Sequence, residues 1–231
     1  MEILKVSDVS KFYGKKQALK NLSFNVENGS ITGLLGPNGS GKTTIIKIIN
    51  SLIDDFSGDV SICGEKIGIS VKELISYLPD VDFLRTDIKI KETIEMYGDF
   101  FKSFDKVKAR EMIKALDLDE TLRIKQLSKG NKEKLQLTLT MARQAKLYIF
   151  DEPIAGVDPA ARDFIIETII KNYHEEGSIL LSTHLIRDIE HIIDKVIFIK
   201  EGEKVLDDDS ENIRIKNNKS IDSLFREVFK C

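Results

Sequence analysis

Eight consecutive residues, Gly36-Pro37-Asn38-Gly39-Ser40-Gly41-Lys42-Thr43, have the types and spacing needed to bind a chain of phosphates. They form the pattern G-x-x-x-x-G-K-[ST], in which glycines let successive backbone N–H groups turn toward phosphate oxygens. Lys42 is expected to contact the β- and γ-phosphates, and the Thr43 hydroxyl to contact Mg²⁺. A random chain of this length shows the pattern about once in a hundred. The pattern therefore predicts a nucleotide-binding loop.

A second segment that could do chemistry is an apolar run, 147–150, that ends in the carboxylates of Asp151 and Glu152. Asp151 is predicted to hold Mg²⁺, usually through water. Glu152 is predicted to act as general base for an attacking water. A strand that simply ends in a polar turn would give the same local pattern. The phosphate loop lies 109 positions earlier (42 to 151), and the two segments together favour a site for ATP and Mg²⁺.

These segments lie among alternating strand and helix patterns, which predict an α/β fold. Strands are predicted at 3–9, 22–26, 31–35, 59–63, 74–78, 147–150, 178–181 and 196–199. A helix is predicted over 42–52, with core positions at Ile45, Ile46, Ile48, Ile49 and Leu52. Further helices are predicted after Asp158-Pro159, where proline occupies the first turn, and over 185–193. The stretch from about 81 to 144 is mostly helical, so we interpret it as an insertion in the α/β core.

The bulk properties are those of an ordinary globular domain of 231 residues, with 42% hydrophobic and 32% charged residues. A net charge of −3 gives no indication of nucleic-acid binding. Two scattered cysteines, Cys63 and Cys231, indicate a reducing compartment. No apolar stretch reaches the roughly 20 residues that span a bilayer, and no leader-like apolar region follows Met1. A membrane function would therefore place the membrane-spanning part on another chain.

The order of five motifs makes the specific resemblance. The phosphate loop at 36–44 is followed by Leu127-Ser128-Lys129-Gly130-Asn131, Asp151-Glu152-Pro153, Ala155-Gly156-Val157-Asp158 and Ser182-Thr183-His184. From about 3 to 206, the chain resembles the nucleotide-binding subunits of ATP-binding-cassette (ABC) transporters. The resemblance implies an ABC ATPase domain over 1–206, with a P-loop NTPase (RecA-like) core, an antiparallel β-subdomain and a helical subdomain at about 81–144. A short tail, 207–231, is expected to end in a helix.

The resemblance also implies roles for individual residues. Ser128 and Gly130 stand in a segment that matches the family's L-S-G-G-Q in three places, and this segment meets the nucleotide of a second subunit; alternatively, Ser128 only caps a helix. Asp158 is expected to couple the two sites, and His184 to contact the γ-phosphate. Tyr13 is expected to stack on adenine, although a lone aromatic in a turn is more often a packing residue. The expected nucleotide contacts are Tyr13, Gly36, Pro37, Asn38, Gly39, Ser40, Gly41, Lys42, Thr43, Thr44, Ser128, Gly130 and Asp158.

One position departs from the family pattern. The family usually has Gln after the strand that corresponds to 74–78, whereas this chain has Asp80. A carboxylate oxygen is a hard ligand, so Asp80 is predicted to contact Mg²⁺ together with Thr43 and Asp151. By resemblance, the surface beside Asp80 and Phe83-Leu84 is expected to dock on a membrane-spanning partner.

The favoured hypothesis is a transport ATPase, a homodimer or heterodimer held at the cytoplasmic face of a membrane by a permease subunit on a separate chain. The segments Leu127-Ser128-Lys129-Gly130 and Ser223-Leu224-Phe225 resemble bacterial exporter cassettes for drugs, antibiotics or peptides. The alternative is a soluble ABC ATPase of DNA repair or translation. Such repair proteins carry a long coiled coil between the phosphate loop and the signature, whereas here this interval is 86 residues (42 to 128). The translation proteins usually carry two cassettes, and this chain has one. A P-loop kinase or GTPase is disfavoured by the signature and by His184.

Overall fold

The fold is built on two β-sheets. The computed structural model describes residues 2–174 and 176–230 of the chain. A four-stranded antiparallel sheet has the order β2-β1-β4-β5. A six-stranded sheet has the order β10-β9-β3-β8-β7-β6, in which β10 runs antiparallel to β9 and the other neighbours are parallel. The strands are β1 (Glu2–Tyr13), β2 (Lys16–Glu27), β3 (Ile31–Leu35), β4 (Ser57–Ile62), β5 (Glu65–Lys66), β6 (Ile75–Leu78), β7 (Leu147–Asp151), β8 (Ser178–Thr183), β9 (Lys195–Lys200) and β10 (Glu203–Asp209). Cys231 lies outside the described residues.

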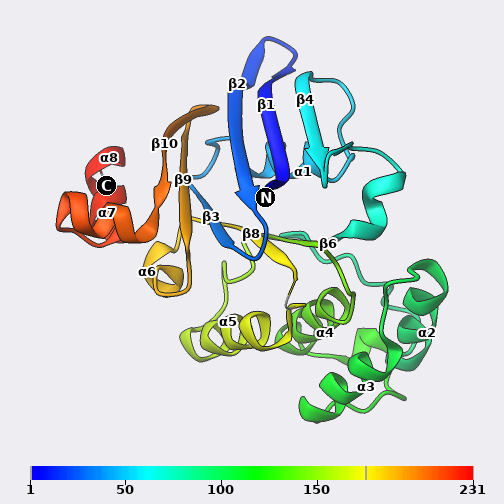
Figure 1. The fold of residues 1–231 in the computed structure, drawn as a ribbon. Coiled ribbons are helices and arrows are strands. Elements are labelled where there is room, and N and C mark those ends of the chain that lie inside the picture. The colour runs from blue at the N-terminus through cyan, green and yellow to red at the C-terminus, as the bar shows by residue number, and fades with distance from the viewer. Residues whose placement is uncertain (1, 175, 231) are drawn as a thin grey trace.

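Helices cover both faces of the six-stranded sheet. Helix α1 packs between the two sheets, and α4 and α5 lie on the opposite face (Figure 1). Helices α2 and α3 lie beyond α4, while α6, α7 and α8 lie near β9 and β10 (Figure 1). The α-helices are α1 (Lys42–Ile49), α2 (Ile90–Phe100), α3 (Lys106–Ala115), α4 (Lys129–Met141), α5 (Pro159–Asn172), α6 (Ile186–Ile189), α7 (Ser210–Asn217) and α8 (Ile221–Phe229), and short 3₁₀ turns cover Ser70–Leu74 and Ile124–Gln126.

The sheet separates two hydrophobic cores because side chains of a strand point alternately to opposite faces. In β7, Leu147 and Ile149 join α1 and the antiparallel sheet, whereas Tyr148 and Phe150 join α4, α5 and the C-terminal helices. All residues of β3, β7 and β8 are buried, as expected for parallel strands covered on both faces. This burial fixes the strand ends that carry the candidate site.

The predicted helix over 42–52 is shorter than expected. It ends at Ile49, where the Asn50 side chain donates to the Ile46 carbonyl over 2.9 Å and Ser51 adopts a φ of 53°. The chain therefore leaves the helix before Leu52, whose surface is 59% exposed. The prediction that Leu52 joins the core is wrong, while Ile45, Ile46, Ile48 and Ile49 are buried as predicted. The helix predicted over 185–193 is also shorter, since α6 covers Ile186–Ile189.

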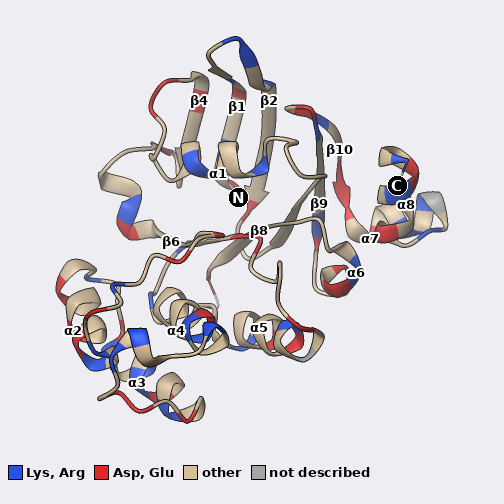
Figure 2. Ribbon diagram, turned by 180° about the vertical axis from the view of Figure 1, so that it is seen from behind, with Lys and Arg blue, Asp and Glu red and all other residues tan. Residues whose placement is uncertain are grey.

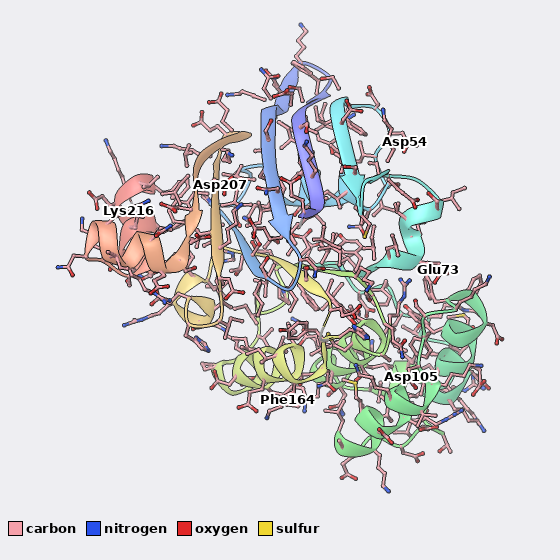
Figure 3. All side chains as sticks on the ribbon, viewed as in Figure 1. Asp54, Glu73, Asp105, Phe164, Asp207 and Lys216 are labelled. Carbon is pink, nitrogen blue, oxygen red and sulfur yellow. The ribbon has the colours of Figure 1, made fainter. Side chains whose placement is uncertain are left out.

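A third core joins α2, α3 and α4, within the stretch that the sequence predicts to be helical. Asp105, labelled in Figure 3, caps α3 by accepting hydrogen bonds from the N–H groups of Val107 and Lys108, each at 2.9 Å. Acidic and basic residues lie side by side along α2 and α3 (Figure 2), and Glu95 of α2 pairs with Lys106 and Arg110 of α3. Among the described residues, no helix has the length and apolar character needed to cross a bilayer.

The C-terminal segment is packed onto the core. Strand β10 continues through position 206, where the sequence places the start of the tail, and pairs with β9 as far as Asp209. Helix α8 packs Phe225 against Phe198 of β9, with ring centroids 5.4 Å apart in an edge-to-face arrangement. Phe229 lies 4.3 Å from Phe225 between centroids, so three rings from two elements form one cluster.

We predict that Phe225→Ala lowers the free energy of unfolding by about 3 kcal/mol, because it removes buried apolar area and leaves a cavity. Urea denaturation followed by circular dichroism measures the change. Ile215→Ala on α7, at a position that is 72% exposed, should change this free energy by no more than about 0.5 kcal/mol. Equal losses in both variants would contradict the packing of α8 on β9.

Candidate active site

The phosphate loop connects the end of β3 to the start of α1, so its backbone and the helix N-terminus can face a bound anion. Gly39 and Gly41 adopt φ values of 80° and 113°, which other residues rarely reach. Gly36 is required for a different reason, because a Cβ atom there would lie 2.3 Å from the Ile199 carbonyl oxygen. The glycines of the motif therefore serve both conformation and close packing.

The loop is held from behind by the turn between β9 and β10. The Gly202 N–H donates to the Ser40 carbonyl over 2.8 Å, and the Gly202 carbonyl accepts from the Lys20 N–H over 2.9 Å. A Cβ atom on Gly202 would lie 2.5 Å from the Ala18 carbonyl oxygen. Gly202 thus packs between the phosphate loop and β2 and contacts both. This role of Gly202 is not predicted from the sequence, because nothing in the local pattern links it to a loop roughly 160 positions earlier.

Lys42 lies beneath the loop with its side chain 5% exposed. Its ammonium donates to the carbonyl oxygens of Gly36 at 2.7 Å and Pro37 at 3.3 Å. It also forms an ion pair with Glu152 Oε1 at 3.2 Å. The predicted phosphate ligand and the predicted general base are therefore in direct contact.

Asp151 ends β7 and has no exposed surface. Its Oδ1 accepts hydrogen bonds from the Ser182 hydroxyl at 2.6 Å and the Thr43 hydroxyl at 3.3 Å. Burial raises the pKa of the Asp151 carboxyl, and the nearby charges of Asp80 and Glu152 add to this shift, while the hydrogen bonds from Ser182 and Thr43 oppose it. Burial also raises the pKa of Tyr77, with further contributions from Asp151 and Asp80.

The donor atoms around Asp151 fit Mg²⁺. The buried Oδ2 of Asp151 has no hydrogen-bond partner within residues 2–174 and 176–230, and Thr43 and Asp80 supply further hard oxygen atoms nearby. Mg²⁺ is commonly held by one or two carboxylates together with substrate phosphates. No group of three or more His, Cys, Asp or Glu side chains in the described chain could hold a metal by itself. Phosphate oxygens and water would therefore complete the coordination.

Glu152 is held between two partners. Its Oε2 lies 3.0 Å from His184 Nδ1, and its side chain is 12% exposed. The backbone adopts a φ of 51°, which costs on the order of 1 kcal/mol or more for a residue with a side chain. The Glu152 N–H donates to the Ser182 carbonyl over 3.0 Å, which satisfies the backbone in this turn.

A cavity of about 580 Å³ joins most of the predicted residues. Tyr13, 49% exposed, lies among its lining residues, together with the loop, Asp80 and Glu152. Thr44, the last predicted loop residue, also lines it. Five residues that the sequence motifs do not predict line the same cavity, namely Lys16, Gln17, Ala18, Lys20 and Glu201. They lie on β2 and the β9–β10 turn, and only the pairing of distant segments brings them to the site.

Three predicted residues lie elsewhere. Ser128 Oγ accepts from the Asn131 N–H over 3.3 Å and caps α4, and Asp158 Oδ1 accepts from the Ala161 N–H over 3.1 Å and caps α5. Gly130 and Asp158 line a second cavity of about 160 Å³. The structure does not bring these three residues to the cavity beside the phosphate loop of the same chain.

Comparisons with known proteins agree with this geometry. A family model described as ABC transporter matches residues 19–155. The chain is 33% identical over 212 residues to an uncharacterized ABC transporter ATP-binding protein of Methanocaldococcus jannaschii, covering 87% of this chain and 76% of the relative. It is 30% identical over 212 residues to the linearmycin resistance ATP-binding protein LnrL of Bacillus subtilis, covering 88% of this chain and 68% of LnrL. A solved ATP-binding subunit of an ABC transporter matches with a TM-score of 0.87 at 25% identity, over 98% of this chain and 99% of that chain. The predicted α/β P-loop NTPase fold class is confirmed.

Two glycine substitutions in the loop should act differently. We expect Gly36→Ala to lower the free energy of unfolding by about 2 kcal/mol, because the new methyl group overlaps the Ile199 carbonyl. A Cβ atom on Gly39 meets no atom within 4 Å, so Gly39→Ala should cost only about 1 kcal/mol for its positive φ. Its methyl group, beside the cavity, should weaken ATP binding about tenfold, equivalent to about 1.4 kcal/mol. Urea denaturation and the anisotropy of a fluorescent ATP analogue measure the two effects. A larger loss of stability in Gly39→Ala than in Gly36→Ala would contradict the close packing assigned to Gly36.

Proposed function

From the premise that the chain belongs to the ABC transporter family, as an ATP-hydrolysing subunit, we propose that Glu152 is the general base for hydrolysis. The observation that carries this proposal is the position of Glu152 at the 580 Å³ cavity, between Lys42 at 3.2 Å and His184 at 3.0 Å. A largely buried carboxylate with these two partners can accept a proton from water held beside the phosphate loop. His184 orients the Glu152 carboxylate. When ATP binds, Lys42 gives up its ion pair with Glu152 and contacts phosphate oxygens instead.

The remaining cavity residues divide between the two ends of ATP. The N–H groups of the loop and of the α1 N-terminus bind the phosphates, and Tyr13 stacks on adenine. Thr43, Asp151 and Asp80 would hold Mg²⁺, which would neutralise charge on the β- and γ-phosphates. Lys16, Gln17, Lys20 and Glu201 extend the cavity on the side of the β1–β2 hairpin.

Two ATPase subunits would complete the site. Ser128, Gly130 and Asp158 lie at the N-termini of α4 and α5, apart from the phosphate loop of their own chain. A helix N-terminus with a capped first turn favours an anion, so these residues can bind the phosphates of a nucleotide held by the partner subunit. A bacterial ABC transporter cassette with a TM-score of 0.78 and 22% identity was solved as a dimer, which supports this arrangement.

A membrane-spanning subunit would dock in an apolar groove of about 330 Å³ between β6 and α2. The groove is lined mainly by apolar and aromatic side chains, including Leu52, Pro79, Phe83, Tyr97 and Phe101. A short amphipathic helix fits such a surface. Pro79 and Phe83 line the groove while Asp80 lines the nucleotide cavity, so one short segment, 79–83, touches both. A shift of Asp80 when the nucleotide binds can therefore be transmitted through this segment to the membrane-spanning subunit in the groove.

Export is the direction that the relatives favour. LnrL is named for linearmycin resistance, and a Nod factor export ATP-binding protein of Burkholderia lata is 30% identical over 207 residues. We propose that the chain drives export of a compound chosen by its membrane-spanning partner, from a position at the inner face of the cell membrane. The alternative is an ABC ATPase that works without a permease. Such a protein would not need an apolar groove as a docking surface for a membrane-spanning subunit.

Glu152→Gln should lower ATP hydrolysis by about 10²- to 10⁴-fold, because the amide cannot act as a base. ATP should still bind, and light scattering behind gel filtration should show an ATP-dependent dimer. Adding Ser128→Ala should weaken that dimer, because it removes a contact with the partner's nucleotide. Hydrolysis at the wild-type rate would reject Glu152 as the base.

Phe83→Asp should detach the chain from its membrane partner. A charge in the apolar groove should lower the fraction of chain recovered with cell membranes by about tenfold, equivalent to about 1.4 kcal/mol. Ile215→Asp on α7 is the matched control, since this position is exposed and lies away from the groove. Circular dichroism checks that both variants fold. Full membrane recovery of Phe83→Asp would reject the groove as the docking site, whereas a wild-type chain that is not recovered with membranes would favour the ATPase without a permease.

A further inference from the structure

Ser182 contacts the side chain of Asp151 and the backbone of Glu152, and it is not one of the predicted ligands of the site. It is fully buried on β8 and lies directly opposite Asp151 in the register of β7 and β8. Its hydroxyl donates to Asp151 Oδ1 over 2.6 Å and accepts from the Glu152 N–H over 3.2 Å. One side chain thus bridges the carboxylate proposed to hold the metal and the backbone of the proposed base.

The bond from Ser182 decides which way the Asp151 carboxylate faces. A carboxylate is planar, so fixing Oδ1 at a short hydrogen bond also fixes the direction of Oδ2. The second donor, Thr43, is weaker at 3.3 Å, and its hydroxyl is itself a proposed ligand of the metal. The Oδ2 atom is left buried, with no hydrogen-bond partner in the described chain.

Acidic neighbours make the ionised Asp151 carboxylate costly unless a hydrogen-bond donor such as Ser182 stabilises it. Asp80 and Glu152 both lie close enough to disfavour negative charge on Asp151. Ser182 is a neutral donor that does not compete for the metal, because its hydroxyl is occupied by Asp151 and the Glu152 N–H. Groups that hydrogen-bond to a metal ligand without contacting the metal set the orientation of that ligand.

We propose that Ser182 is a positioning residue that aims Asp151 Oδ2 at Mg²⁺ and keeps the turn carrying Glu152 in register with it. The inference rests on the proposed metal site and not on the assignment of Glu152 as base. It predicts that loss of the Ser182 hydroxyl weakens the contribution of Mg²⁺ to nucleotide binding while leaving the phosphate loop able to bind.

The test measures binding of a fluorescent, non-hydrolysable ATP analogue by anisotropy, in EDTA and in Mg²⁺. The dissociation constant in EDTA divided by that in Mg²⁺ gives the coupling between metal and nucleotide. In Ser182→Ala this ratio should fall by about 10- to 100-fold, the usual cost of removing an outer partner of a metal ligand. The dissociation constant in EDTA should stay within about twofold of wild type, and Ser182→Thr, which keeps the hydroxyl, should restore the ratio.

Ser178→Ala is the matched control. Ser178 lies on the same strand, is equally buried, and its hydroxyl accepts from the Gly29 N–H over 2.9 Å at the other end of β8. An equal fall of the ratio in Ser178→Ala, or an unchanged ratio in Ser182→Ala, would overturn the inference. If Ser182→Ala does not fold, Ser182→Cys provides the comparison, since its weaker donor should give a smaller fall in the same direction.

The same titration separates this inference from the proposed function. A wild-type chain that fails to bind the analogue contradicts the nucleotide site as a whole. A wild-type chain that binds equally well in EDTA and Mg²⁺ removes the metal site and the role of Ser182 with it. Because the readout is binding, an error in the assignment of Glu152 as base leaves the result for Ser182 unchanged.

Discussion

The buried carboxylate of Asp151 is the interaction on which the site depends. Removing an ion from water costs several kcal/mol unless partners compensate, and Asp151 has no exposed surface. Two hydroxyl groups, from Ser182 and Thr43, compensate on one oxygen only. The other oxygen remains without a partner in the described chain, and the proposed cation would compensate it. Neighbouring elements must then hold both hydroxyl groups in place.

The parallel sheet meets this requirement through its register. Asp151 pairs with Ser182, and Leu35, the last residue before the loop, pairs with Thr183. The carboxyl ends of β3, β7 and β8 therefore meet at one edge, where parallel α/β sheets bind ligands. A slip of one residue would turn every side chain of a strand to the other face, and the buried alternation of β7 opposes such a slip. Burial of Leu147 to Phe150 thus fixes Asp151 by the same contacts that build the two cores.

Local patterns predict the parts of the site that one short segment encodes. The glycine spacing of 36–43 and the apolar run before Asp151 each reflect a single strand and its turn. The parts that local patterns do not predict depend on pairs of distant segments. Gly202 supports the loop from the β9–β10 turn, and Glu201 enters the cavity from that turn. The prediction for Leu52 fails because the helical period continues through Asn50, whereas the Asn50 side chain ends the helix. Periodicity reports which face would be buried, but not where a cap interrupts it.

Asp80, at the position where the resemblance leads us to expect Gln, adds to the same electrostatic constraint. Three carboxylates, Asp80, Asp151 and Glu152, lie at or beside one cavity, and the ammonium of Lys42 contacts Glu152. In the proposed function Lys42 binds a phosphate, so Glu152 would lose that partner and the phosphates would add negative charge. A neutral amide at position 80 would reduce this charge, whereas the carboxylate makes occupancy by a divalent cation more favourable. Asp80 lies in a segment that also lines the groove. Arg143 of the groove pairs with Glu73, which Figure 3 labels. The short segment 79–83 therefore contributes both to the charge of the nucleotide cavity, through Asp80, and to the lining of the groove, through Pro79 and Phe83.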